Sequence, residues 1–313
     1  MDRSPTATFT ELHIDAARNA TDDFNPFHDR HRWQRIENNP FQGPIALGFQ
    51  IEQFVEDAID RHRQEAGDHP RIRDGGLDYS CYDLKFVAAI EAGEPVTVQV
   101  RETRVSPNSG ELSNRIVVRT RRGPAVIGFK RELKRAPFSV DLSGLDRDTV
   151  NRASDRDYVG TSGFFVKRKY LTTSNAKNFL AGSGVDQSRY IDEIVGKIRF
   201  SEVFCCSMLS CALLERGIRH GYDFMANPMV YTSHDIVVDR RVRNSLHSND
   251  LIHFLVREAL PGTDAGKRTA PEGLSQIMHE CVGMTEYADV IFTANIALSP
   301  LAEIVKRSNV VQV

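Results

Sequence analysis

The sequence predicts an α+β protein made of two copies of one domain, each a long helix packed against an antiparallel β-sheet. Its 313 residues suffice for two domains of roughly 150 residues each. In each half an apolar helix precedes several strand-like runs. The segments that begin at Asp83 and Asp235 also align as strand, turn and strand, an internal repeat of about 150 residues. Two such sheets joined edge to edge would each cover an open edge of the other.

The first long helix is expected from Gly43, in GPIALGFQIEQFVEDAIDRHRQ. Its apolar residues follow helical spacing and form one face. The Gly43-Pro44 pair suits a first helical turn, because proline has no amide to leave unpaired there. The residues of the apolar face are Ile45, Leu47, Ile51, Phe54, Val55, Ala58 and Ile59.

Strands are expected after this helix. In residues 77–105, Val96, Val98 and Val100 alternate with polar residues, and the AGEP stretch before them resembles a hairpin connection. In residues 112–133, apolar pairs lie on both sides of Gly123-Pro124, which predicts another strand pair.

The second half repeats this order after a polar, turn-rich segment. We expect an N-terminal domain over 1–137, a linker over 138–158 and a C-terminal domain over 159–313. An apolar helix should run from Arg199 to near Gly217 or Gly221. Two extended runs around SLHSND follow, and then a strand-rich stretch from His279.

Composition argues against several classes of protein. Forty basic and forty-two acidic residues leave a formal charge of -2, so no strong field would attract nucleic acid or an anionic membrane. The first twenty residues do not resemble a secretory signal, and no apolar run is long enough for a membrane span. A cytoplasmic protein is therefore expected. The five cysteines lack C-x-x-C spacing, which argues against a zinc site, and Cys205, Cys206 and Cys211 should pack as small hydrophobes.

The stretch DDFNPFH, residues 22–28, combines two carboxylates and an imidazole around an Asn-Pro corner. Pro26 fixes its own backbone and directs Asn25 away from helix, so Asp23 and His28 flank a turn. The pair could form an acid and base facing one space. Alternatively, the aspartates cap a short helix, Asn25 stabilises its own turn and His28 is a surface residue.

This stretch and the FQGPIALGF segment from Phe41 resemble the signature of the MaoC-like, (R)-specific enoyl-thioester hydratases. That family's pattern reads Gly-Asp-x-Asn-Pro-x-His, a loop, and Pro-Ile-x-His-Gly at a helix entrance. The residues that match are Asp23, Asn25, Pro26, His28, Pro44, Ile45 and Gly48. The resemblance implies a double hotdog fold, in which two long helices are each wrapped by an antiparallel sheet and the halves form one continuous sheet.

The resemblance also implies a reaction, the interconversion of a 2-enoyl thioester and its (R)-3-hydroxyacyl form on coenzyme A or an acyl carrier protein. Asp23 and His28 would be the catalytic residues. Asn25 would shape the turn, and the Gly48 amide would polarise the thioester carbonyl at the helix N-terminus. No cofactor or metal is expected, because dinucleotide, Walker and H-E-x-x-H motifs are missing from the sequence and His28 with His31 lack a third ligand. The protein could be a monomer or a homodimer.

Two departures from the family pattern leave alternatives open. Asp22 stands in place of glycine and Leu47 in place of histidine. In the second half, aligning Asp186 with Asp23 places Ile191 where His28 would be, so that half would keep the scaffold and lose the dyad. A non-catalytic double hotdog that binds an acyl thioester or a partner is therefore an alternative. A hotdog thioesterase is a third, although that class lacks the Asn-Pro-x-His pattern.

Overall fold

The computed structural model describes residues 4–259 and 275–310. Within them, twelve strands form one sheet in the order β1-β3-β5-β6-β2-β11-β14-β13-β12-β8-β7, with β4 paired to β5. The N-terminal strands are β1 (Thr6–Thr8), β2 (Tyr79–Phe86), β3 (Pro95–Val100), β4 (Arg104–Val105), β5 (Leu112–Thr120) and β6 (Gly123–Leu133). The C-terminal strands of this sheet are β7 (Asp157–Tyr158), β8 (Phe165–Leu171), β11 (Met229–Asp239), β12 (Asp250–Glu258), β13 (Ile277–Thr285) and β14 (Val290–Pro300).

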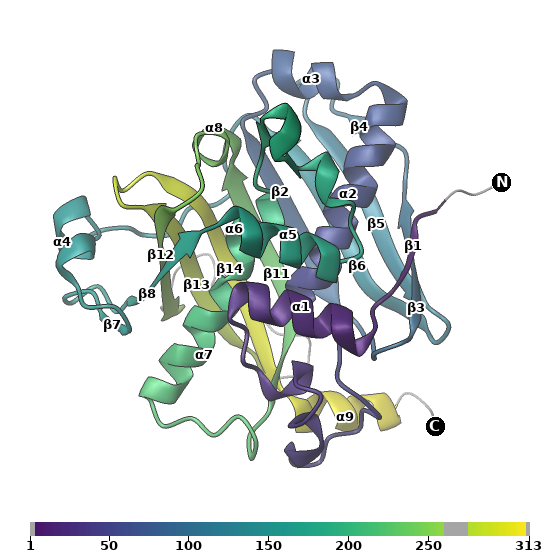
Figure 1. Cartoon of the computed structure of the whole chain (residues 1–313), viewed down its shortest axis with the longest axis vertical. Coiled ribbons are helices and arrows are strands. Elements are labelled where there is room, and N and C mark those ends of the chain that lie inside the picture. The colour runs from purple at the N-terminus through teal and green to yellow at the C-terminus, as the bar shows by residue number, and fades with distance from the viewer. Residues whose placement is uncertain (1–3, 260–274, 311–313) are drawn as a thin grey trace.

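The two halves meet at the centre of this sheet, where β2 pairs antiparallel with β11 (Figure 1). Asp83 lies directly opposite Asp235. The residues at which the two repeats align are thus the residues that pair across the junction, as an approximate two-fold axis at this point requires. The α+β prediction of a double hotdog with one continuous sheet is confirmed.

The long helices cover one side of the sheet (Figure 1). The longest is α2 (Gly48–Ala66), and its counterpart is interrupted at Met208 into α6 (Glu202–Ser207) and α7 (Leu209–Arg219). The other helices are α1 (Glu11–Thr21), α3 (His69–Asp74), α4 (Arg147–Arg152), α5 (Thr173–Gly182), α8 (Arg240–Asn244) and α9 (Leu301–Val310). The short 3-10 turns are η1 (Pro26–His28), η2 (Trp33–Arg35), η3 (Gln187–Arg189) and η4 (Glu193–Val195), and a separate two-stranded sheet pairs β9 (Ile191–Asp192) with β10 (Lys197–Ile198).

The expected start of the first helix at Gly43 is wrong. The helix begins at Gly48, because residues 43–47 are held in an extended course by other backbone groups. The Ala46 amide donates to the Ile90 carbonyl (2.8 Å), and the Ala92 amide donates to the Pro44 carbonyl (2.9 Å).

The same contacts explain why the expected hairpin around AGEP does not form. The chain after β2 is tied to residues 43–47, so β3 pairs with β5 and β1 instead of with β2. In the second half α8 intervenes after β11, and β12 pairs with β8 and β13. The strand pair around Gly123-Pro124 does form, as β5 and β6.

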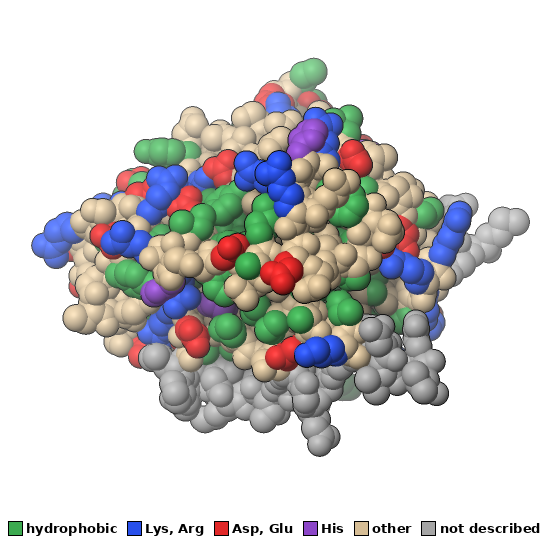
Figure 2. Space-filling model, turned by 90° about the horizontal axis from the view of Figure 1, so that it is seen from below, with side chains coloured by type: hydrophobic (Ala, Val, Ile, Leu, Met, Phe, Trp, Pro, Cys, Tyr) green, Lys and Arg blue, Asp and Glu red, His purple; other side chains and the backbone are tan. Residues whose placement is uncertain are grey.

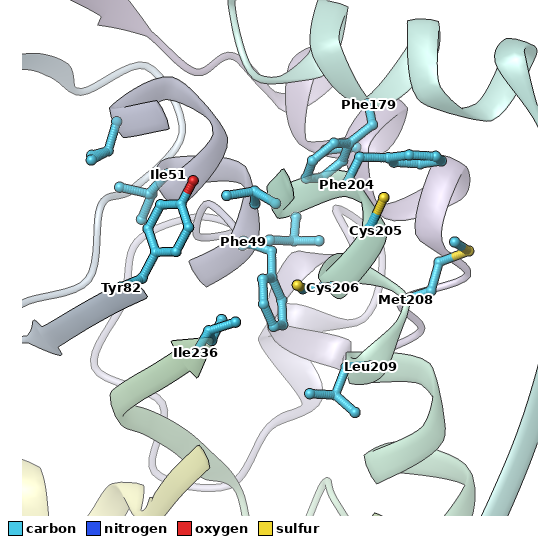
Figure 3. Close-up of a cluster of buried hydrophobic side chains, with 14 of the residues drawn as sticks. Phe49, Ile51, Tyr82, Phe179, Phe204, Cys205, Cys206, Met208, Leu209 and Ile236 are labelled. Carbon is cyan, nitrogen blue, oxygen red and sulfur yellow. The ribbon is translucent and has the colours of Figure 1, made fainter. Parts of the chain in front are cut away.

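The core lies between the helices and the sheet. Figure 3 shows Phe49 of α2 near Cys206 of α6 and Leu209 of α7, with Ile236 of β11 beside them. All five cysteines are buried, as expected for Cys205, Cys206 and Cys211. Burial raises the pKa of the Cys205 thiol to about 12, so it packs as an apolar side chain.

The sequence analysis missed α1 and α5, which pack closely against each other. Gly182 allows this approach, because a Cβ there would lie 2.7 Å from the His13 carbonyl oxygen. The segment expected as a linker, 138–158, contains α4 and β7 and packs an apolar cluster on the sheet that includes Val140, Leu145 and Val150. Burial of these side chains therefore holds this segment against the sheet. No helix in the described ranges has the length and apolar character needed to cross a membrane.

Candidate active site

His28 is the last residue of η1, in the turn that follows α1. Asn25 caps this turn: its side-chain oxygen accepts from the Phe27 amide (3.1 Å), and Pro26 occupies the first position. The imidazole Nδ1 lies 2.7 Å from the Ile45 carbonyl oxygen. Since a carbonyl only accepts, Nδ1 carries the proton, and Nε2 of the neutral ring keeps a free lone pair.

The surroundings of His28 favour this neutral form. Burial lowers the pKa of the imidazole below its usual value, and the Arg18 guanidinium lowers it further. Asp23 and the Ile45 carbonyl oppose this shift but do not overcome it. His28 is therefore a base at neutral pH rather than a fixed cation.

Asp23 is buried beside this turn and Asp22 is not. The Asp23 carboxylate accepts from the Asn25 amide (2.9 Å), while Asp22, in a left-handed conformation at the end of α1, forms an ion pair with Lys169. The two carboxylates thus point to different partners. No hydrogen bond in the described structure joins Asp23 to His28, and their interaction is electrostatic.

A cavity of about 420 Å³ lies beside His28. His28, Asn25 and Gly48 line it, whereas Asp23 does not. Most of the other lining side chains are apolar and come from both halves of the chain, which is typical of a site for a small organic ligand. They include Phe27, Phe41, Ile45, Ile51, Phe86, Leu213, Leu214, Tyr231, Ile277, Leu298 and Leu301. Figure 2 shows the underside of the molecule, where hydrophobic side chains gather among charged ones.

Gly48 places the start of α2 against the cavity. Its amide is the first of the helix and has no intrahelical partner, so it can donate to a ligand oxygen. Gln50 fixes this end of the helix, because its side chain accepts from the Leu47 amide (3.2 Å) and donates to the Gly182 carbonyl (2.6 Å). A Cβ at Gly48 would lie 3.2 Å from the Phe86 ring.

Beneath Gly48 lies a buried pair that the sequence analysis missed. His234 Nδ1 is 2.9 Å from a Glu52 carboxylate oxygen, and both residues are fully buried. The imidazole stacks among Phe49, Phe86 and Tyr231, with ring centroids 4.6 to 4.8 Å away. The sequence offered no signal for this pair, because the two residues are far apart in the chain and strand pairing brings them together.

Tyr231 was also missed. Its ring lines the cavity and its hydroxyl is 2.9 Å from that of Ser210. Burial raises the pKa of Tyr231, and the nearby Asp23 carboxylate raises it further. The hydroxyl therefore stays protonated. Asp23 acts electrostatically on two residues that line the cavity, His28 and Tyr231.

The corresponding turn of the second half carries Arg189 where the first carries His28. In each half a helix is followed by four residues and a 3-10 turn, and the fourth of these residues caps the turn: Asn25 in one half and Asp186 in the other. Asp186 therefore matches Asn25, and the expected alignment of Asp186 with Asp23 and of Ile191 with His28 is wrong. The shift arises because that alignment followed residue type, whereas the caps fix the register. In the described structure this turn supplies no imidazole.

The counterpart of the His234 and Glu52 pair is also changed. The two-fold relation at Asp83 and Asp235 makes Tyr82 the equivalent of His234, and the Tyr82 hydroxyl donates to Glu202 (2.8 Å) at the start of α6. Lys130 pairs with Tyr82 as Ile296 pairs with His234. A buried lysine therefore stands where the first site has an apolar residue.

Charged side chains fill this second position. The Lys130 ammonium lies 2.7 Å from Glu202 and 3.1 Å from Glu132. Burial raises the pKa of Glu56 nearby to about 7, with the Glu202 carboxylate as the second cause. The remaining cavity has a volume of only about 90 Å³. This position is too small and polar for an acyl chain.

No cluster of three metal-ligating side chains occurs among the described residues. His31 is exposed beside the buried His28, so the two do not converge.

The fold is similar to that of several solved proteins. A putative MaoC domain protein dehydratase from Chloroflexus aurantiacus is 11% identical, with a TM-score of 0.54, over 95% of this chain and 93% of that chain. A conserved hypothetical protein from Mycobacterium tuberculosis, described as a double hotdog fold, is 11% identical, with a TM-score of 0.55, over 96% and 95% of the two chains. The peroxisomal multifunctional enzyme type 2 of Drosophila melanogaster is 9% identical, with a TM-score of 0.52, over 94% of this chain and 48% of that chain.

These similarities show the double hotdog fold. No protein-family model matches the sequence, and no curated protein matches it.

Proposed function

We propose that this protein is a hydro-lyase of the MaoC-like type that interconverts a 2-enoyl thioester and its (R)-3-hydroxyacyl form, carried on coenzyme A or an acyl carrier protein. One observation carries the proposal: a neutral imidazole, His28, lines an apolar cavity together with the first amide of a buried helix, Gly48. Fold similarity alone would not carry it, because one fold hosts many activities.

The reaction adds the hydroxyl of water to C3 and a proton to C2, so it needs a base, an acid and a donor to the carbonyl oxygen. The free Nε2 of His28 accepts a proton from the water as the water oxygen bonds to C3, and the imidazolium that forms returns this proton to C2. Asp23, buried behind it, completes the dyad and stabilises the imidazolium that forms. The Gly48 amide donates to the thioester oxygen as negative charge develops there.

A specific observation favours the alternative of a non-catalytic acyl-thioester-binding protein: Asp23 does not line the cavity, and its carboxylate already accepts from the Asn25 amide. Against it, Phe27 and Phe41 line the cavity without filling it. No geometric observation favours a thioesterase.

The test is hydration of crotonyl-CoA and longer 2-enoyl-CoA thioesters by the purified chain. His28→Ala and Asp23→Asn should each lower kcat by about a hundredfold or more. His31→Ala, an exposed neighbour, should keep wild-type turnover. Wild-type rates in both the His28 and the Asp23 variants would overturn the assignment of these residues as the catalytic pair. No hydration by the wild type while it binds acyl-CoA would support the non-catalytic alternative.

A further inference from the structure

The cavity beside His28 has a second polar group of residues, formed by the C-terminal half. Arg216, in the last turn of α7, and His279, near the start of β13, both line it. Only 7% of the His279 surface is exposed. Burial lowers the pKa of His279 to about 3, and the Arg216 guanidinium is the second cause. The two side chains are therefore neighbours, and the imidazole is neutral.

Both residues have donors or acceptors without a partner. The buried Nε of Arg216 and the buried Nδ1 of His279 form no hydrogen bond in the described structure. Buried polar groups are nearly always paired, and an unpaired donor of a guanidinium is costly. Two such atoms at one cavity indicate a ligand group that accepts hydrogen bonds from them.

Strand register shows how far this group is from the proposed reaction centre. His234, which lies against Gly48, pairs with Ile296 of β14, and Ile296 pairs with His279 of β13. Two strand spacings separate His234 from His279, a distance of about 10 Å across the sheet. The polar group is therefore far from the thioester position and on the same face of the sheet.

Apolar side chains line the path between the two ends. Tyr231, Leu298 and Ile277 form the neighbouring row in register across the same three strands. Leu213 and Leu214 of α7 also line the cavity. This path suits a hydrocarbon chain. It does not suit the amide-rich arm of a carrier, because the backbone groups of the strands that line the path are already paired within the sheet and cannot bind those amides.

We propose that the substrate's acyl chain ends in a carboxylate, which Arg216 and His279 bind at the far end of the cavity. This inference rests on the proposed function for the position of the thioester. Arg216 supplies the positive charge and an Nε donor, and the imidazole of His279 supplies a second donor. Glu258 and His220 also line the cavity but are exposed, and His220 contacts the Tyr158 hydroxyl.

The experiment measures binding of saturated acyl-CoA thioesters, which cannot react. Adipoyl-, suberoyl- and sebacoyl-CoA are compared by calorimetry with hexanoyl-, octanoyl- and decanoyl-CoA. For the best-fitting length, the ω-carboxyl compound should bind the wild type roughly tenfold more tightly or better, as expected for one charge-assisted contact. Arg216→Met should abolish this preference, and Arg216→Lys should retain part of it.

Arg219→Met is the matched control, since Arg219 is exposed on the same helix and does not line the cavity. Its preference should equal that of the wild type. Equal binding of both series by the wild type, or an unchanged preference in Arg216→Met, would overturn the inference. If Arg216 instead binds a carrier phosphate, Arg216→Met would weaken both CoA series equally and leave binding of the phosphate-free N-acetylcysteamine thioesters unchanged, which would also overturn it.

Because binding needs no turnover, the two proposals fail separately. If the protein prefers the ω-carboxyl thioesters but does not hydrate 2-enoyl-CoA, the proposed reaction is wrong and the carboxylate site stands. If it hydrates 2-enoyl-CoA but has no such preference, the carboxylate site is wrong and the proposed reaction stands.

Discussion

Arg189 occupies in the C-terminal half the position that His28 occupies in the N-terminal half, at the end of the 3-10 turn that follows the first helix. His28 faces a cavity, whereas Arg189 binds Asp57 and Asp60 of α2, each at 2.7 Å. The same local backbone thus presents a base in one half and a structural cation in the other.

Arg189→Ala should therefore reduce stability without reducing turnover. Asp57 is nearly fully buried and keeps only its contact with Arg61 (2.7 Å) after the substitution. We expect a loss of about 1–3 kcal/mol in the free energy of unfolding, measured with urea, and a kcat/KM within about twofold of wild type. A large loss of kcat/KM at full stability would show that Arg189 takes part in the reaction.

Lys130→Met should be more damaging, since Glu132 and Glu202 would both lose a buried cationic partner. Removing one member of a buried ion pair costs about 3–5 kcal/mol. Urea unfolding should show a loss in this range, whereas Lys134→Met, at an exposed position, should change stability by less than about 0.5 kcal/mol. A neutral result for Lys130→Met would mean that the network does not stabilise the fold.

Turnover should depend on His28 remaining neutral. Because the pKa of His28 is lowered, its imidazole becomes protonated only at a pH below the usual histidine pKa of about 6.5. The pH profile of kcat/KM should therefore stay flat as pH falls through about 6.5 and decline only at lower pH. A decline centred above about 6.5 would contradict this account of the site.

Stability should fall in acid because His279 is buried in its neutral form. Its folded-state pKa of about 3 lies below the unfolded value of about 6.5, so the unfolded chain binds the proton first. The resulting stability is complete above about pH 6.5 and is lost as pH falls towards the folded pKa, at up to about 1.4 kcal/mol per pH unit. His279→Gln should give a flatter curve in urea titrations over this range. An unchanged slope would show that the imidazole is protonated in the folded state.

Gly48→Ala should affect activity more than stability. The added Cβ would lie 3.2 Å from the Phe86 ring and 3.4 Å from the His234 ring, so these rings must shift beside the amide proposed to bind the thioester. We expect kcat/KM to fall about tenfold, since small misplacements of reacting groups are costly, with less than about 1 kcal/mol lost in stability. Gly43→Ala, where a Cβ would meet no atom within 4 Å, is the control.

The architecture could be predicted from the sequence because two of its causes are local. Apolar periodicity marked α2 and the combined α6 and α7, alternation marked β3, and the apolar pairs around Gly123-Pro124 marked β5 and β6. The aligned Asp83 and Asp235 even proved to be partners across the junction. The hairpin expected around residues 92–95 was wrong because strand pairing depends on distant backbone partners, which no local pattern records.

The candidate site shows the same limit. The turn around Asn25 and Pro26 was predictable from residue chemistry, and the structure brings His28 and Gly48 to one cavity. Glu52 with His234, and Arg216 with His279, each join residues from different elements. The register of β11, β14 and β13 places His234 and His279 on one face of the sheet, and the packing of α2 and α7 on that face brings Glu52 and Arg216 to them. The mispositioned Asp186 shows further that caps, rather than residue types, should guide alignment of degenerate repeats.

The cavity wall is shared by the two halves of the chain. On the proposed function, substitutions in residues 213–231 would therefore alter which compounds are admitted while Asp23, His28 and Gly48 continue to perform the same reaction. If the turn at His28 is the reactive one, the C-terminal half of the chain can change the ligand that fits the cavity without changing the reactive residues. Two identical subunits do not have this freedom, because each substitution occurs in both of them.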